Sequence, residues 1–218
     1  VMKPQEVDAP IKNLNPELKN PFVIPGIRNL KIESQLNPNY SFDNFLEGDS
    51  NRLARSAGMA VANKPGGTSF NPLLIFGGVG LGKTHLIQAV GNAIKEKYEN
   101  KKVHYMTLEK FATDFINSLQ SNKANSFKEK YRKYDLLIVD DIQFFAGKQK
   151  TEEEFFHLFN SFYDNNKQII FSSDKHPNFI PGLEERLKSR FSAAAVSTKP
   201  RICFFSSSRL ALRASRSD

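Results

Sequence analysis

Residues 77–84, with the sequence GGVGLGKT, restrict the fold of this chain more than any other segment. They fit the pattern G-x-x-x-x-G-K-[S/T], and they lie between an apolar run and a helical pattern that begins HLIQAVGNAI. Glycines allow a tight loop whose backbone N–H groups face an anion, and the start of the next helix adds positive potential. An ordinary glycine-rich turn before a helix is the alternative, but the Lys-Thr pair at this spacing favours a phosphate-binding loop.

This loop predicts a nucleotide site. The residues expected to surround the phosphates are Gly78, Val79, Gly80, Leu81, Gly82, Lys83 and Thr84. Lys83 would reach the β- and γ-phosphates, and the Thr84 hydroxyl would bind Mg²⁺. The expected cofactors are therefore ATP or ADP together with Mg²⁺. For His85, next to the loop, we expect a packing or surface role rather than catalysis.

An acidic pair follows a second apolar run, in which the residues LLIV at 136–139 lead into Asp140 and Asp141. A buried strand that ends in paired carboxylates is typical of a Walker B motif. Asp140 would bind Mg²⁺ directly or through water, and Asp141 would orient or polarise the attacking water. Taken alone, the pair fits a solvated acidic turn equally well. The phosphate loop upstream favours the metal and water site.

Short β-rich apolar runs recur at residues 73–76, 103–107, 136–139 and 168–172, and helical patterns separate them. This alternation predicts an α/β fold in which helices flank a parallel sheet. One helix is expected at about residues 50–62. Another follows the second strand, where four apolar residues recur at helical spacing: Leu108, Phe111, Phe115 and Leu119.

A further helix is expected after residue 150, because Thr151 and Glu154 have the spacing of a capping box. Four apolar side chains then fall on one helical face. We interpret them as core rather than as a stacking platform for bases: Phe155, Leu158, Phe159 and Phe162.

A chain of 218 residues suits one domain with flanking segments. Residues 1–35 contain five prolines and no sustained period, which predicts a flexible linker. The domain is expected at residues 36–191. Residues 192–218 are a mixture rich in Ser, Ala and Arg, which indicates a disordered tail or miscoding, such as a frame shift.

The net charge of +8 is weak evidence for nucleic-acid binding, because five basic residues and Asp218 give the tail +4 and leave +4 for the rest. The one cysteine, Cys203, excludes an internal disulfide and fits a reducing compartment. No apolar run approaches the roughly 20 residues of a membrane helix, and the first residues lack a signal-peptide pattern. A cytoplasmic protein is expected.

Several segments together resemble the AAA+ domain of the DnaA family of bacterial chromosomal replication initiators, over residues 36–191. They are LNPNYSFDNFLEGDSNRLA, GGVGLGKTHL, LLIVDDIQFFAGK, SSD and GLEERLKSRF. The resemblance implies a three-layer P-loop NTPase (AAA+) fold and a weak ATPase that acts as a switch. Asp rather than Glu at position 141 places the carboxylate farther from the water, which predicts slow turnover.

The resemblance also assigns roles by position. Asp174 corresponds to the sensor 1 residue near the γ-phosphate, and a plain strand-end turn is the alternative. Arg190 corresponds to the arginine finger offered to ATP on a neighbouring subunit, with Arg186 in the same motif. Without the family, these arginines would be read as solvated charges at a helix end. Guanidinium groups suit the finger role because they stay charged and make forked contacts to phosphate.

Three further positions follow from the same resemblance. Glu109 falls at a glutamate linked to hydrolysis, although an acid at a helix start is an equally good explanation. Ile116 and Lys150 align with a single-strand DNA path. A core role competes strongly for Ile116, which neighbours Phe115, whereas an exposed cation at position 150 can meet a phosphate backbone. Residues 37–51 correspond to the part that closes over the nucleotide base.

The implied function is ATP-dependent self-assembly through Arg190 at a replication origin, with DNA unwinding during initiation. Family members continue past Phe191 into a helical lid and a duplex-reading domain, and these are missing here. Nucleotide affinity and hydrolysis are therefore expected to fall, and sequence-specific origin binding is expected to be absent. Contacts to the replicative helicase machinery would use regions mostly absent from this sequence. A DnaA-like adaptor or helicase loader that acts through protein partners is the alternative, and a poorly folding fragment is a third.

Overall fold

The structure, a computed structural model, describes residues 34–145 and 147–198. Within these residues, five parallel strands form one sheet in the order β2-β3-β4-β1-β5. The strands are β1 (Leu73–Phe76), β2 (Val103–Thr107), β3 (Leu136–Asp140), β4 (Gln168–Ser173) and β5 (Ala195–Ser197). The four strands predicted from the apolar runs are confirmed, β3 and β4 with one more residue each.

Strands β3 and β4 lie inside the sheet, and all of their residues are buried. A strand in this position has a neighbour on each side and helices over each face, so it needs a continuous apolar sequence rather than an alternating one. This explains why the runs at 136–139 and 168–172 show no period of two. The polar residues at their carboxyl ends are then placed together at one edge of the sheet.

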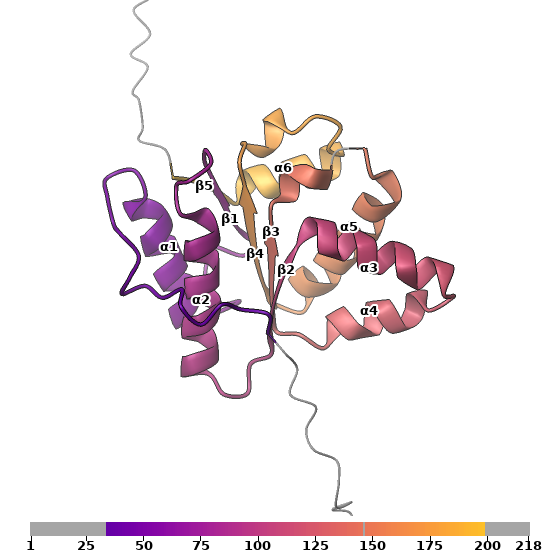
Figure 1. Cartoon of the computed structure of the whole chain (residues 1–218), viewed down its shortest axis with the longest axis horizontal. Coiled ribbons are helices and arrows are strands. Elements are labelled where there is room, and N and C mark those ends of the chain that lie inside the picture. The colour runs from indigo at the N-terminus through magenta and orange to yellow at the C-terminus, as the bar shows by residue number, and fades with distance from the viewer. Residues whose placement is uncertain (1–33, 146, 199–218) are drawn as a thin grey trace, which may run out of the picture. The chain divides into compact units, whose positions relative to one another are not determined.

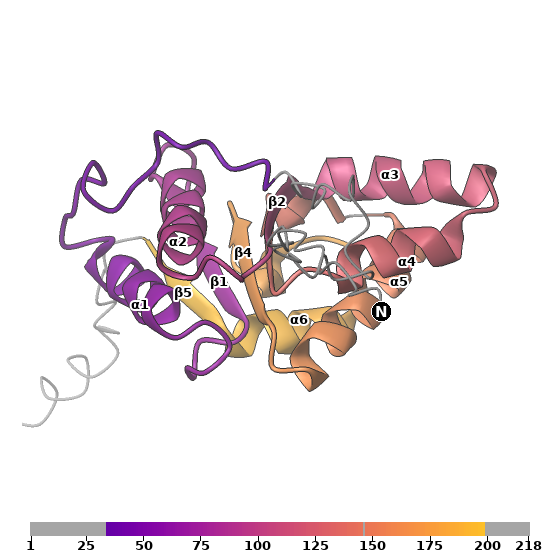
Figure 2. The same ribbon diagram turned by 90° about the horizontal axis from the view of Figure 1, so that it is seen from below.

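Helices cover both faces of this sheet (Figures 1 and 2). Helices α1 (Arg52–Asn63) and α2 (Lys83–Lys97) pack on one face and share a core with apolar side chains of all five strands. The other face is covered by α3 (Leu108–Gln120), α4 (Ala124–Arg132), α5 (Gln149–Asp164) and α6 (Glu185–Ala193). The predicted three-layer α/β fold is confirmed. No helix among the described residues is long and apolar enough to cross a membrane.

The core under α3 to α6 is rich in aromatic rings. The four side chains predicted as core on α5 are buried, with exposed fractions of 0 to 6%. On α3, however, Ile116 is 49% exposed and Leu119 is 43% exposed, so a core role for Ile116 is wrong. The reason is helical geometry: Phe115 points into the core, and the next residue lies about 100° farther round the helix, toward solvent.

The capping box predicted for α5 is also wrong. The helix begins at Gln149 with Lys148 as its N-cap, so Thr151 already lies within the first turn, and its backbone N donates to the Lys148 carbonyl at 2.8 Å. The carboxylate of Glu154 instead forms an ion pair with Lys128 of α4, at 3.1 Å. Helix α4 itself has no counterpart among the predicted elements.

The domain extends beyond Phe191, the predicted end. Helix α6 continues to Ala193, and the following residues form β5, which pairs in parallel with β1. The backbone N of Thr198 donates to the Phe76 carbonyl at 2.9 Å. The predicted tail therefore begins too early by seven residues, while 199–218 lie outside the described residues.

Most of the predicted linker lies outside the described residues, which begin at Ser34. The carbonyl of Ser34 accepts a hydrogen bond from the Tyr105 backbone N at 2.8 Å, along the edge strand β2. The last two residues of the predicted linker are therefore part of the folded domain.

Candidate nucleotide-binding site

The sequence-predicted site residues come from three neighbouring strands of the sheet. The phosphate loop follows β1, Asp174 follows β4, and Asp140 ends β3, with Asp141 directly after it. In the sheet, β4 lies between β1 and β3, and all three run in the same direction. Their carboxyl ends therefore meet at one edge, which is where ligands bind in open parallel sheets.

The phosphate loop joins β1 to α2 through two glycines with left-handed backbones. Gly80 has φ of 79°, and Gly82, the N-cap of α2, has φ of 76°. A side chain at Gly82 would be strained by this φ and would also lie 3.1 Å from the Phe45 ring. Because the first N–H groups of a helix have no partner within it, this helix start presents donors and positive potential to an anion.

Lys83 is the first residue of α2, and its side chain is only 7% exposed. Its Nζ forms an ion pair with Asp174 Oδ1 at 2.7 Å and donates to the Gly78 carbonyl at 2.9 Å. The ammonium group is thus held between the loop backbone and the end of β4. These two contacts hold the ammonium group of Lys83 beside the phosphate loop, so a phosphate bound in the loop would lie near it.

Asp140 is buried and accepts two hydrogen bonds. The Tyr105 hydroxyl donates to its Oδ2 at 2.9 Å, and the Ser172 hydroxyl donates to its Oδ1. Burial and the neighbouring Asp140 carboxylate raise the pKa of Tyr105, so this phenol stays a donor. Asp140 and the half-buried Thr84 offer oxygen donors of the kind that Mg²⁺ prefers.

The described residues contain no cluster of three or more metal-ligating side chains. Mg²⁺ in nucleotide sites uses one or two protein oxygens and completes its shell with phosphates and water, so the oxygens of Asp140 and Thr84 would suffice. The residues present therefore fit the ion that the sequence predicts.

Asp141 has a left-handed backbone with φ of 60°, which is unusual for a residue with a side chain. Its backbone N donates to the Ser172 hydroxyl oxygen at 2.9 Å, and this bond holds the turn against β4. Burial raises the pKa of Asp141, and the negative charges of Asp140 and Asp174 act in the same direction. The Gln143 amide and Lys83 oppose this shift.

Sequence reasoning missed Tyr105 and Ser172, whose hydroxyls donate to Asp140. It also missed Gln143, which lies in the short 3-10 helix Ile142–Phe145 after β3 and whose side chain reaches both Asp141 and Asp174. The position of Gln143 two residues after the acidic pair was the available signal, but glutamine has no recognised chemistry there. The geometry, rather than the residue type, reveals its place.

Other predicted residues are not brought into this cluster. Glu109 is exposed in the first turn of α3. Arg190 is exposed on α6, and its guanidinium lies over the Tyr163 ring at 5.5 Å, without an ion pair to any described residue. Lys150 is exposed in the first turn of α5.

His85, on α2, contacts residues 40–45 through hydrogen bonds and ring contacts, in agreement with the predicted packing role. Its Nε2 lies 3.0 Å from the Ser41 carbonyl and 2.9 Å from Asn44 Oδ1, and its ring contacts those of Tyr40 and Phe45. Phe45 in turn approaches Gly82 of the phosphate loop. The segment expected to close over the base is therefore fixed beside the loop.

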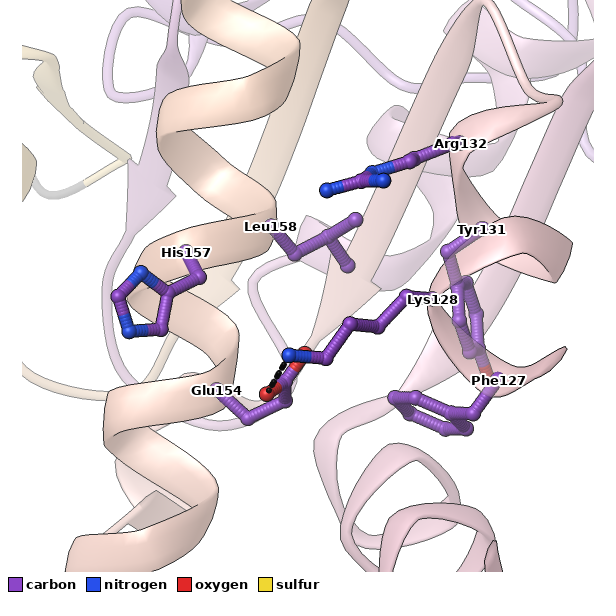
Figure 3. Close-up of a pocket in the computed structure, with 7 residues that line it drawn as sticks. All are labelled: Phe127, Lys128, Tyr131, Arg132, Glu154, His157 and Leu158. Atoms are coloured by element: carbon purple, nitrogen blue, oxygen red, sulfur yellow. Dashed lines mark ion pairs between the residues drawn. The ribbon is translucent and has the colours of Figure 1, made fainter. Parts of the chain in front are cut away.

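A separate pocket of about 270 Å³ lies between α4 and α5 (Figure 3). It is lined by Phe127, Lys128, Tyr131, Arg132, Glu154, His157 and Leu158. The Lys128–Glu154 ion pair crosses it, and Arg132 pairs with Glu129 at 3.3 Å, so its charges are largely compensated. None of the predicted site residues lines it.

A parallel sheet, a phosphate loop and an acidic pair at the end of a neighbouring strand define a P-loop NTPase domain of the AAA+ class. The sequence model described as "Bacterial DnaA ATPAse domain" matches residues 36–198, and the chain belongs to this family. The match continues through β5, so the expectation that the sequence departs from the family after Phe191 is wrong for residues 192–198.

Relatives found by sequence agree with this family assignment. The chain is 63% identical over 190 residues to the chromosomal replication initiator protein DnaA of Flavobacterium psychrophilum, covering 87% of this chain and 40% of that protein. It is 54% identical over 164 residues to the DnaA of Geotalea daltonii, covering 75% of this chain and 37% of that protein. This chain thus spans about two fifths of such relatives.

Among solved structures, domain III of DnaA from Thermotoga maritima has a TM-score of 0.72 at 45% identity, covering 74% of this chain and 67% of that one. A replication initiator DnaA bound to AMPPCP and single-stranded DNA also has a TM-score of 0.72, at 41% identity, covering 75% of this chain and 50% of that one. The DnaC helicase loader, at 18% identity and a TM-score of 0.57, shares the fold alone. These values favour an initiator over the adaptor or loader alternative.

Proposed function

We propose that this domain binds ATP and ADP with Mg²⁺ and serves as the nucleotide-controlled assembly module of a cytoplasmic chromosomal replication initiator. The observation that carries the proposal is the placement of Lys83. Its ammonium group is buried at the start of α2 and is held by Asp174 from the neighbouring strand and by the loop backbone. A buried ammonium at a helix start is suited to phosphate, because it adds a full charge to the backbone donors there.

Asp140 and Thr84 would hold the Mg²⁺ ion, which supplies charge neutralisation to the β- and γ-phosphates when bound. Asp140 is kept in place by Tyr105 and Ser172. Asp141 would orient the attacking water, with Asp174 beside the γ-phosphate, while Glu109 would act at the end of β2. Because an aspartate reaches less far than a glutamate, hydrolysis would be slow and would serve as a switch.

Arg190 would act on the nucleotide of a neighbouring copy. Its exposed guanidinium rests on Tyr163, outside the cluster around its own phosphate loop, and is therefore free to meet another subunit. Arginine is suited to this contact because its charge persists and its geometry matches phosphate oxygens. ATP would then bridge adjacent copies into an oligomer.

Single-stranded DNA would run past Ile116 and Lys150. Ile116 presents an apolar side chain to solvent on α3, and Lys150 presents a cation at the start of α5. Exposed apolar groups and cations together suit a flexible strand, which offers bases and phosphates at once. Duplex recognition and contacts to the replicative helicase would belong to other parts of a full-length initiator.

The decisive experiment is equilibrium binding of fluorescent ATP and ADP to the 218-residue chain with Mg²⁺, beside Lys83→Ala and the control Lys95→Ala on the same helix. Tight binding that is lost only in Lys83→Ala supports the phosphate site. Absence of binding by the parent chain would contradict the proposal for this polypeptide.

Assembly is tested next by sedimentation velocity with ATP or ADP. The proposal expects larger species with ATP and their loss in Arg190→Ala. The control Lys188→Ala changes a cation of the same helix that pairs locally with Glu185, and it should assemble like the parent. Equal sedimentation of the parent with both nucleotides would contradict the assembly role.

A further inference from the structure

Gln143 links the two acidic positions of the site through one side chain. Its Nε2 donates to Asp141 Oδ1 at 3.0 Å and to Asp174 Oδ2 at 3.3 Å. Its Oε1 accepts from the Asp174 backbone N at 3.2 Å. The amide therefore fixes the carboxylate at the end of β3 against both the side chain and the backbone at the end of β4.

The connection continues to the phosphate loop. Asp174 shares its carboxylate between two partners, with Oδ2 on Gln143 and Oδ1 on Lys83. Gln143 is also the one described residue whose side chain donates to the Asp141 carboxylate. Asp141 is thus linked to Lys83 through Gln143 and Asp174, without a direct contact.

We propose that Gln143 is a positioning residue that transmits the state of the phosphate loop, through Lys83 and Asp174, to the orientation of the Asp141 carboxylate. This inference rests on the proposed nucleotide-binding function. Phosphates that engage Lys83 weaken its pairing with Asp174. The Asp174 carboxylate then rearranges, and Gln143, which is bonded to it, moves or reorients together with Asp141.

A primary amide suits this position for a physical reason. Three carboxylates lie close together here, and a charged or purely apolar side chain at position 143 could not donate to two of them while accepting from a backbone N–H. Gln143 is half-buried, so methionine can fill a similar volume. Gln143→Met therefore removes the hydrogen bonds and preserves most of the packing.

The first test uses ¹H–¹⁵N correlation spectra of the nucleotide-free full chain, in which the Gln143 side-chain signals are those lost in Gln143→Met. Lys83→Met, which does not touch Gln143, is expected to shift these signals, and the shift should vanish when Asp174→Asn is already present. The control Lys95→Met should leave them unchanged. Gln143 signals that do not respond to Lys83→Met would overturn the inference, whether or not the chain binds nucleotide.

The second test separates binding from hydrolysis. Gln143→Met is expected to bind fluorescent ATP within about threefold of the parent but to hydrolyse it about tenfold more slowly or worse in single turnover, because a misplaced group near the reacting atoms is costly. The exposed Gln120→Met is the matched control. Hydrolysis by Gln143→Met at the parent's rate would contradict the positioning role. A parent that binds no nucleotide would refute the proposed function instead, and the nucleotide-free spectra would still decide the inference.

Discussion

Replacing Gly77, the first glycine of the phosphate loop, by alanine should destabilise the domain by about 2–4 kcal/mol. A Cβ at this position would lie 2.0 Å from the Thr198 hydroxyl oxygen and 3.2 Å from a methyl carbon of Leu81. Thr198 is 1% exposed, and its backbone N and hydroxyl both donate to the Phe76 carbonyl, at 2.9 and 3.2 Å. Overpacking costs about 1–3 kcal/mol, and each lost buried hydrogen bond adds about 1 kcal/mol.

Urea unfolding of the full chain measures this cost, and a shifted midpoint at constant slope would identify a change in stability. Gly80→Ala is the matched control. No atom lies within 4 Å of its added Cβ, so only the left-handed backbone at φ of 79° opposes it, at about 1 kcal/mol.

A double-mutant cycle tests whether Thr198 is the cause. Thr198→Ala removes the clashing oxygen, so Gly77→Ala should cost at least about 1 kcal/mol less in that background than in the parent. Costs that add within about 0.5 kcal/mol would refute the reasoning, because they would mean that the two positions do not meet.

The effects of three other substitutions on stability or binding follow from burial and charge. Phe191→Ala should cost about 3–5 kcal/mol in urea unfolding, because the ring is fully buried 4.7 Å from that of Phe171, whereas Phe179→Ala, at 73% exposure, should cost little. Burial raises the pKa of Glu152 above its ordinary 4.5. The parent should therefore gain stability relative to Glu152→Gln as the pH falls through this raised pKa toward 4.5. A difference in Tm between the two proteins that does not change with pH would contradict this. Ile116→Ala should change the free energy of unfolding by less than about 1 kcal/mol while weakening binding of a labelled single strand, measured by anisotropy.

The sheet and the main site were predictable because each depends on a local signal. Four strands contain short runs rich in apolar and β-forming residues, and the loop after β1 combines a glycine pattern with Lys83 and Thr84. The rule that parallel strands end at one edge then brings Asp140 and Asp174 together. Their closeness also depends on the pairing of β4 with β3, and the role of Asp174 was assigned from the family resemblance.

The parts that were missed depend on contacts distant in the sequence. Strand β5 has three residues, of which only Val196 is buried, and it is defined by pairing with β1 more than 115 residues earlier. Glu154 has the spacing of a capping residue but forms an ion pair with Lys128 on α4. Gln143 acquires its place from Asp174 on the next strand, which no pattern around position 143 reveals.

The left-handed turn at Asp141 limits how far this site can be reused in protein engineering. Its backbone N is bonded to Ser172, whose hydroxyl is in turn bonded to Asp140, so the geometry of the acidic pair is supplied by the neighbouring strand. A graft of residues 136–141 into another parallel sheet would carry the carboxylates but not their directions. The smallest transferable unit is the pair of strand ends, with a serine at the position of Ser172.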